Sequence, residues 1–141
     1  MDSGQIDRAE RTVNTDEARI RSHRDLVVWQ KAMDLVDLIY DISEGFPASE
    51  TFALTPQMKR AVVSVPANIA EGQSRSTARD FAHFLTVARS SLMETETLLM
   101  VAVRRGYAAE ANAGPAFSLI VEISKMLASL RKRLLLKRVG D

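Results

Sequence analysis

The chain has 141 residues and a net charge of +1, with 46% hydrophobic and 26% charged residues. This length fits one domain with its own core, and the composition is ordinary for a folded globular protein. Because the chain has no cysteine and only two histidines, disulfides and thiolate metal sites are excluded, and we expect no metal and no cofactor.

Neither a membrane span nor a secretory segment is evident in the sequence. No uninterrupted apolar run reaches the roughly 18 to 20 residues that cross a bilayer. The N-terminal residues Met-Asp-Ser-Gly-Gln do not begin a secretory hydrophobic segment. We therefore expect a cytoplasmic protein that does not bind a membrane.

The charge is distributed unevenly along the chain. Residues 26–50 contain one base and five acids, a balance of −4, whereas residues 51–140 contain 13 bases and six acids, a balance of +7. This separation of negative and positive charge along the chain favours head-to-tail self-assembly, an anionic partner, or both. Solvated charged faces that only maintain solubility would give the same pattern.

Residues 1–24 mix charged and small polar residues without a sustained apolar face, so we predict a flexible N-terminal tail followed by one domain at 25–138. The first predicted helix covers 26–43, with Asp25 as its cap and Gly45 near its end. Its apolar positions span about 220° of the circumference, whereas one core-facing stripe needs about 100°. The excess predicts a second contact surface.

The second predicted helix begins at the capping residue Thr55, with Pro56 in its first turn, and is loosened or ended by Gly72. Pro66 lies in its interior and should bend it. One row of polar side chains repeats at helical spacing on an otherwise apolar segment, which predicts that the row is buried and paired with another helix or subunit. This row consists of Gln57, Arg60, Ser64, Asn68, Glu71 and Arg75.

The third predicted helix starts near Ser76 or Thr77, with Asp80 in a capping-box-like position, and ends before Gly106. The fourth starts around Gly114 and runs to about residue 138. Its apolar positions again span about 220°, which leaves a surplus apolar face. Since no segment alternates with a period of two, we predict an all-α fold, an up-and-down four-helix bundle.

Several runs of residues, taken in chain order, resemble the 23S rRNA intervening-sequence proteins, also called four-helix bundle proteins. These runs are 26–32 (LVVWQKA), 54–61 (LTPQMKRA), 65–72 (VPANIAEG) and 81–94 (FAHFLTVARSSLME). The resemblance implies a bundle that assembles into a ring of five subunits. It also implies kinship with accessory proteins of diversity-generating retroelements, which bind nucleic acid and a reverse transcriptase through a basic surface. Gln57, Arg60, Ser64, Asn68 and Glu71 all fall on positions of the family pattern.

No enzymatic constellation is convincing. Arg79 and His83 resemble the Arg/His element of the helical HEPN ribonucleases, but the spacing is one residue short, which turns His83 by about 100° on a helix. Glu94 and Glu96 diverge on a helix because they are two residues apart. We expect a protein that is not an enzyme.

Nucleic-acid binding is the function that we predict, through bases gathered at one end of the bundle. If neighbouring helices are antiparallel, the end of the fourth helix lies near the start of the third. Repetition of these bases in a ring would attract phosphates, although bases at a helix C-terminus also stabilise the helix dipole. The alternative is a protein scaffold or adaptor, for example for a reverse transcriptase, without nucleic-acid contact. The predicted nucleic-acid-binding residues are Arg75, Arg79, Arg131, Lys132, Arg133, Lys137 and Arg138.

Overall fold

The computed structural model describes residues 22–140, and their side chains as far as residue 136. The predicted N-terminal tail at 1–24 therefore lies outside the described residues except for its last three. Four long helices account for most of the described chain: α2 (Val27–Ser43), α3 (Leu54–Gln73), α4 (Ala78–Arg104) and α5 (Glu110–Gly140). Two short 3₁₀ turns, η2 (His23–Asp25) and η3 (Ala48–Glu50), precede α2 and α3 respectively. Since residues 22–140 contain no strand, the predicted all-α class is confirmed.

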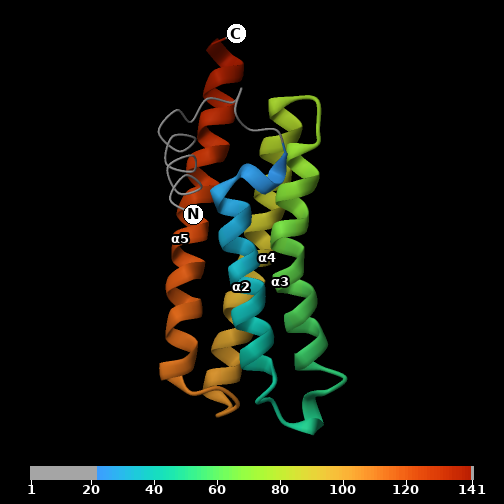
Figure 1. Ribbon diagram of the computed structural model, residues 1–141, viewed down its shortest axis with the longest axis vertical. Helices are drawn as coiled ribbons and strands as arrows, with labels where there is room; N and C mark the ends of the chain where they lie inside the picture. The colour runs from blue at the N-terminus through green and yellow to red at the C-terminus, as the bar shows by residue number, and fades with distance from the viewer. Residues whose placement is uncertain (1–21, 141) are drawn as a thin grey trace, which may run out of the picture.

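Consecutive helices are joined at alternating ends of the molecule, as in an up-and-down bundle (Figure 1). The main contacts join α2 to α3, α3 to α4, α4 to α5 and α5 back to α2. Helix α2 is therefore diagonal to α4, and α3 is diagonal to α5. The α3–α4 connection and the C-terminal part of α5 lie at one end, and the α2–α3 and α4–α5 connections lie at the other (Figure 1).

All four helices contribute to one hydrophobic core. Its large, fully buried side chains are Leu35 and Ile39 from α2, Met58, Val62, Val65 and Ile69 from α3, Leu85, Leu92 and Leu99 from α4, and Ile120, Ile123 and Leu127 from α5. Thr95 is a buried polar residue within the core, and its hydroxyl donates to the Ser91 carbonyl at 2.9 Å. This local bond removes the cost of burying the hydroxyl.

The predicted ends of α4 are confirmed. The Thr77 hydroxyl accepts a hydrogen bond from the Asp80 N–H at 3.1 Å, as expected of an N-cap. At the other end Gly106 has a φ of 76°, which an L side chain adopts only with strain. The Tyr107 N–H donates to the Ala102 carbonyl at 2.8 Å and the Gly106 N–H to the Val103 carbonyl at 3.0 Å, the two bonds of a Schellman motif.

Two predicted caps are wrong. Helix α2 has Leu26 as its N-cap, because the preceding residues, including Asp25, form η2 instead. Helix α3 has Ala53 as its N-cap, and Thr55 lies in its first turn. The Leu54 N–H is satisfied by the side chain of Glu50, which accepts at 3.2 Å, so a carboxylate from η3 performs the capping that we assigned to Thr55.

The predicted start of α5 is also wrong, because the helix begins at Glu110, four residues before Gly114. Ala113 is fully buried, so its packing in the core stabilises a helix that starts earlier. Glu110 in the first turn stabilises the positive end of the helix dipole. Pro115 is the sixth residue of the helix and has no N–H to donate to the Ala111 carbonyl, so it removes one bond of the helix ladder.

Gly72 does not end α3, which continues to Gln73. It is buried where α3 and α4 come together, and a Cβ added there would lie 2.8 Å from the Phe84 Cβ and 2.9 Å from the Phe81 Cδ1. The glycine therefore permits close approach of the two helices. This packing role replaces the predicted helix-ending role.

Candidate functional site

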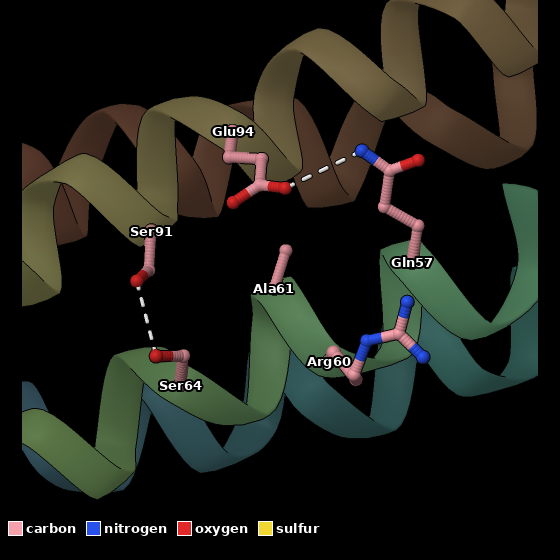
Figure 2. Close-up of a pocket in the computed structure, with 6 residues that line it drawn as sticks. All are labelled: Gln57, Arg60, Ala61, Ser64, Ser91 and Glu94. Carbon is pink, nitrogen blue, oxygen red and sulfur yellow. Dashed lines mark hydrogen bonds between the residues drawn. The ribbon is translucent and has the colours of Figure 1, made fainter.

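A polar groove lies between α3 and α4, along the first half of the predicted polar row. It is open to solvent, has a volume of about 400 Å³, and is lined by Gln57, Arg60, Ala61, Ser64, Ser91 and Glu94. Figure 2 shows the α3 residues of the groove facing Ser91 and Glu94 of α4 across it. The small side chains of Ala61 and the serines leave the space open.

Two hydrogen bonds cross this groove (Figure 2). The Ser91 hydroxyl donates to the Ser64 hydroxyl at 3.1 Å, and the Gln57 Nε2 donates to a Glu94 carboxylate oxygen at a longer 3.5 Å. Asn68, one turn after Ser64, donates from its Nδ2 to the Ser64 Oγ at 3.0 Å and to the Ser64 carbonyl at 2.8 Å. The row thus pairs α3 with α4 in one chain and sets their relative positions.

The single chain buries this row only in part, so burial of the whole row stays a prediction that depends on another subunit. Ser64 and Asn68 are half-buried, whereas Gln57, Arg60 and Glu71 are exposed. The reason is that the core covers only one side of α3, and part of its apolar circumference, including Val63, is exposed as well. Helix α3 thus has apolar residues around nearly its whole circumference, but the other helices of the same chain cover only part of it.

Arg60 has no hydrogen bond or ion pair with any other residue in the described range 22–136, although it lines the groove together with Gln57 (Figure 2). Glu71 is paired within its own chain, because its carboxylate accepts from Arg75, just beyond the end of α3, at 3.0 Å. Pairing of Arg60 with Glu71 between chains stays a prediction. Chemically, the part of the chain that the structure describes gives this groove the Arg60 cation, the Glu94 carboxylate and neutral hydroxyls.

Reasoning from sequence missed the α4 side of this groove. Glu94 was considered only as a catalytic carboxylate, and Ser91 was not placed at all. The signal was available, because the two residues are three apart on a helix and so face the same neighbour. What the sequence does not show is which neighbour that is.

The predicted nucleic-acid-binding bases gather at one end of the bundle, which we call the basic end. Arg131, Lys132 and Arg133 are exposed in the last part of α5, and Arg75 and Arg79 are exposed at the α3–α4 connection. Figure 1 places these two segments at the same end, as the antiparallel arrangement predicts. Lys137 and Arg138 belong to the same helix, but their side chains lie outside the described part of the chain.

The bases at this end differ in their surroundings. Arg75 binds Glu71 and stacks on Phe84, with its guanidinium carbon 4.8 Å from the ring centroid. Such contacts give Arg75 a structural role of its own. Arg79 and the three α5 bases have no ion pair with another residue of the range 22–136, so their charges face solvent.

Arg79 and His83 lie exposed on the outer surface of α4. His83 contacts the edge of Phe84, with ring centroids 5.6 Å apart. Within residues 22–136, no hydrogen bond joins these two side chains, and the groove described above does not include either of them. The predicted absence of enzymatic activity stays a prediction.

By length and average composition, α5 could cross a membrane, since one window within Glu110–Leu136 is sufficiently apolar. The prediction of no membrane span considered uninterrupted apolar runs and so missed this window. In the bundle, one side of α5 supplies Ile120, Ile123 and Leu127 to the core. A core helix passes the same test, so the predicted cytoplasmic location stays a prediction.

Comparison with known proteins identifies the family. The 23S rRNA-intervening sequence protein family matches residues 24–129, and the chain belongs to this family. A crystal structure of a protein with unknown function from the S23 ribosomal protein family of Bacteroides thetaiotaomicron has a similar fold, with a TM-score of 0.70 and 26% identity. The match covers 75% of this chain and 99% of that one. No curated protein matches the chain.

Proposed function

We propose that this member of the 23S rRNA-intervening sequence protein family is a non-enzymatic homo-oligomer, a ring of five copies, that binds RNA or another structured nucleic acid through its basic end. The observation that carries the proposal is the exposure of Arg79, Arg131, Lys132 and Arg133 at the same end of the bundle. None of these four side chains is neutralised by an ion pair within the range 22–136.

Phosphate attraction depends on the number of bases that reach the backbone together. One copy presents a small cluster, whereas a ring places identical clusters side by side around its axis. Each cluster then adds to the same positive potential, which also raises the rate of encounter with a polyanion. Assembly and nucleic-acid binding are therefore linked in this proposal.

Binding is expected to follow charge and backbone shape rather than base sequence. The phenylalanine rings near the start of α4 are those of Phe81 and Phe84, which are half-buried against the bundle, and Arg75 covers Phe84. Rings in this position are not free to stack on bases. Contacts from flexible arginines and lysines to phosphates position a nucleic acid without reading its sequence.

The second candidate is a scaffold or adaptor that binds another protein, such as a reverse transcriptase, without nucleic-acid contact. It is favoured by exposed apolar side chains on several helices, including Met33 of α2, Met100 of α4 and Val121 of α5. Contiguous exposed apolar area marks protein interfaces. The same area also serves self-association, so it does not exclude the first candidate.

Titration of a fluorescently labelled, structured RNA at about 50 mM and about 200 mM salt separates the two candidates. A phosphate-binding protein loses affinity steeply between the two conditions, because each contact contributes about 0.9 to the slope of log K against log salt. A scaffold shows no binding even at the lower salt concentration, and that result would overturn the proposal.

A matched pair of variants locates the binding surface. The double variant Arg131→Gln/Arg133→Gln removes two exposed arginines from the basic end, and Arg104→Gln/Arg105→Gln removes two exposed arginines from the opposite end. We expect the first variant to lower the salt slope by up to about 1.8 for each copy that contacts the RNA, and the second to leave it unchanged. Equal effects of the two variants would show that binding does not depend on the basic end.

A further inference from the structure

The groove between α3 and α4 contains two opposite charges that do not neutralise each other. Arg60 lines it from α3 and Glu94 lines it from α4, and both residues are exposed. Within residues 22–136, no ion pair joins these two side chains or binds either of them to a third residue. A direct pair at an exposed position would contribute little, because solvent screens the charges and two long side chains would have to be ordered. Both charges are therefore available to a ligand.

The Glu94 carboxylate has an oxygen to offer such a ligand. The Gln57 Nε2 donates to one of its two oxygens at 3.5 Å, which is longer than an ordinary hydrogen bond. The other oxygen accepts no hydrogen bond from the described residues 22–136. An ionised carboxylate accepts hydrogen bonds and donates none, so its partner must be a donor. Its charge favours a cationic donor, such as an ammonium group.

The two serines of the groove add a hydroxyl donor. The Ser64 Oγ accepts from the Ser91 hydroxyl at 3.1 Å and from the Asn68 Nδ2 at 3.0 Å. Since a hydroxyl has two lone pairs and one proton, the Ser64 proton is left for a further acceptor. If the bond between the serines has the opposite direction, the Ser91 proton is left instead. In both cases a side chain that lines the groove can donate to an anionic group, as can the Arg60 guanidinium.

The size of the groove limits the ligand to a small molecule. Its volume of about 400 Å³ is near the lower end of the range for ligand sites. The stretch of α3 from Gln57 to Ser64 measures about 10 Å along the helix axis. Ala61, which is 4% exposed, lies between the serine pair and Gln57 (Figure 2), and the other five lining residues of the described chain are polar. Such a lining binds polar groups and does not select a large apolar side chain.

We propose that this groove binds a small zwitterion, an α-amino acid, whose carboxylate contacts Arg60 and a serine hydroxyl and whose ammonium group contacts Glu94. One guanidinium and one carboxylate match a ligand that carries one charge of each sign. A phosphate ester fits less well, because it adds negative charge and has no cation for Glu94. The inference goes beyond the proposed function, since it involves neither the basic end nor self-association.

Saturation-transfer NMR on the full chain, with glycine as the probe, tests the site, because this method detects weak binding at any oligomeric state. Two matched compounds each lack one charge: N-acetylglycine keeps the carboxylate, and methylamine keeps the ammonium group. We expect glycine to bind and each of the other two to bind about tenfold more weakly, since each loses one set of charge-assisted hydrogen bonds. If glycine does not bind the wild type, or if inorganic phosphate binds more tightly than glycine, the proposal is overturned, whatever the oligomeric state.

Three variants at exposed positions connect the binding to individual charges, and circular dichroism verifies that their helices are retained. Arg60→Gln should weaken glycine binding about tenfold, whereas Arg89→Gln, which removes an exposed arginine of α4 outside the groove, should leave it unchanged. Glu94→Gln should remove the preference for glycine over N-acetylglycine, because the charge that attracts an ammonium group and repels an anion is gone. A purely structural role of Glu94 would weaken both compounds equally and keep the preference. That result, or equal glycine binding by Arg60→Gln and Arg89→Gln, would overturn the proposal.

Discussion

Substitution of Gly72 by alanine should destabilise the bundle, although alanine is the better helix former. In an exposed helix interior this change stabilises by about 1 kcal/mol, because it reduces the entropy lost on folding. At Gly72 the new methyl carbon would lie 2.8 Å from the Phe84 Cβ and 3.2 Å from the Phe81 carbonyl oxygen. Neither atom is the end of a flexible side chain, so α3 and α4 must separate.

Overpacking of a well-packed core costs about 1 to 3 kcal/mol, so after the propensity gain we expect Gly72→Ala to be destabilised by about 0 to 2 kcal/mol. Urea unfolding at a fixed protein concentration measures the difference from the wild type. Ala67→Gly is the matched control, because Ala67 is exposed in the same helix and the change should destabilise by the propensity difference alone, about 1 kcal/mol. If Gly72→Ala were stabilised by that same amount, α3 and α4 would not be in close contact at Gly72.

Three further substitutions test the core, a cap and an exposed ring. Leu35→Ala removes a fully buried side chain and should lower the free energy of unfolding by about 2 to 5 kcal/mol in denaturant titration; a smaller loss would mean that the site is not close-packed. Thr77→Ala should cost about 1 kcal/mol in thermal unfolding, because the bond to the Asp80 N–H is lost, whereas Ser76→Ala should be neutral. Phe52→Ala should change the free energy of unfolding by less than about 0.5 kcal/mol, since Phe52 is 96% exposed; a larger loss would place the ring against other residues.

The fold was predictable from sequence because four strongly periodic segments are separated by clear turn residues. Thr77 and Gly106 mark the ends of α4 through local chemistry, a side-chain cap and a positive φ, which depend only on nearby residues. The caps of α2 and α3 were not predictable in this way. Glu50 caps α3 from a 3₁₀ turn only four residues earlier, and the sequence pattern did not reveal that turn. The early start of α5 depends on tertiary packing, because Ala113 is buried in the core.

The candidate site was predictable only in part, for a related reason. Helical spacing places Gln57, Ser64 and Asn68 in one row, but it does not show that α4 covers just one edge of that row. The two partners on α4, Ser91 and Glu94, emerge from the packing of α3 against α4. Clustering of the bases at one end followed from the alternating helix directions, which the sequence does indicate through its short connections.

The most direct test of the account is the mass of the wild-type protein, measured by sedimentation equilibrium over a range of micromolar concentrations. We predict a species whose mass is a multiple of 15.6 kDa, five copies for the proposed ring. A folded protein of 15.6 kDa at every concentration would contradict the account, because exposed apolar side chains such as Met33, Met100 and Val121 would then have no second copy to cover them.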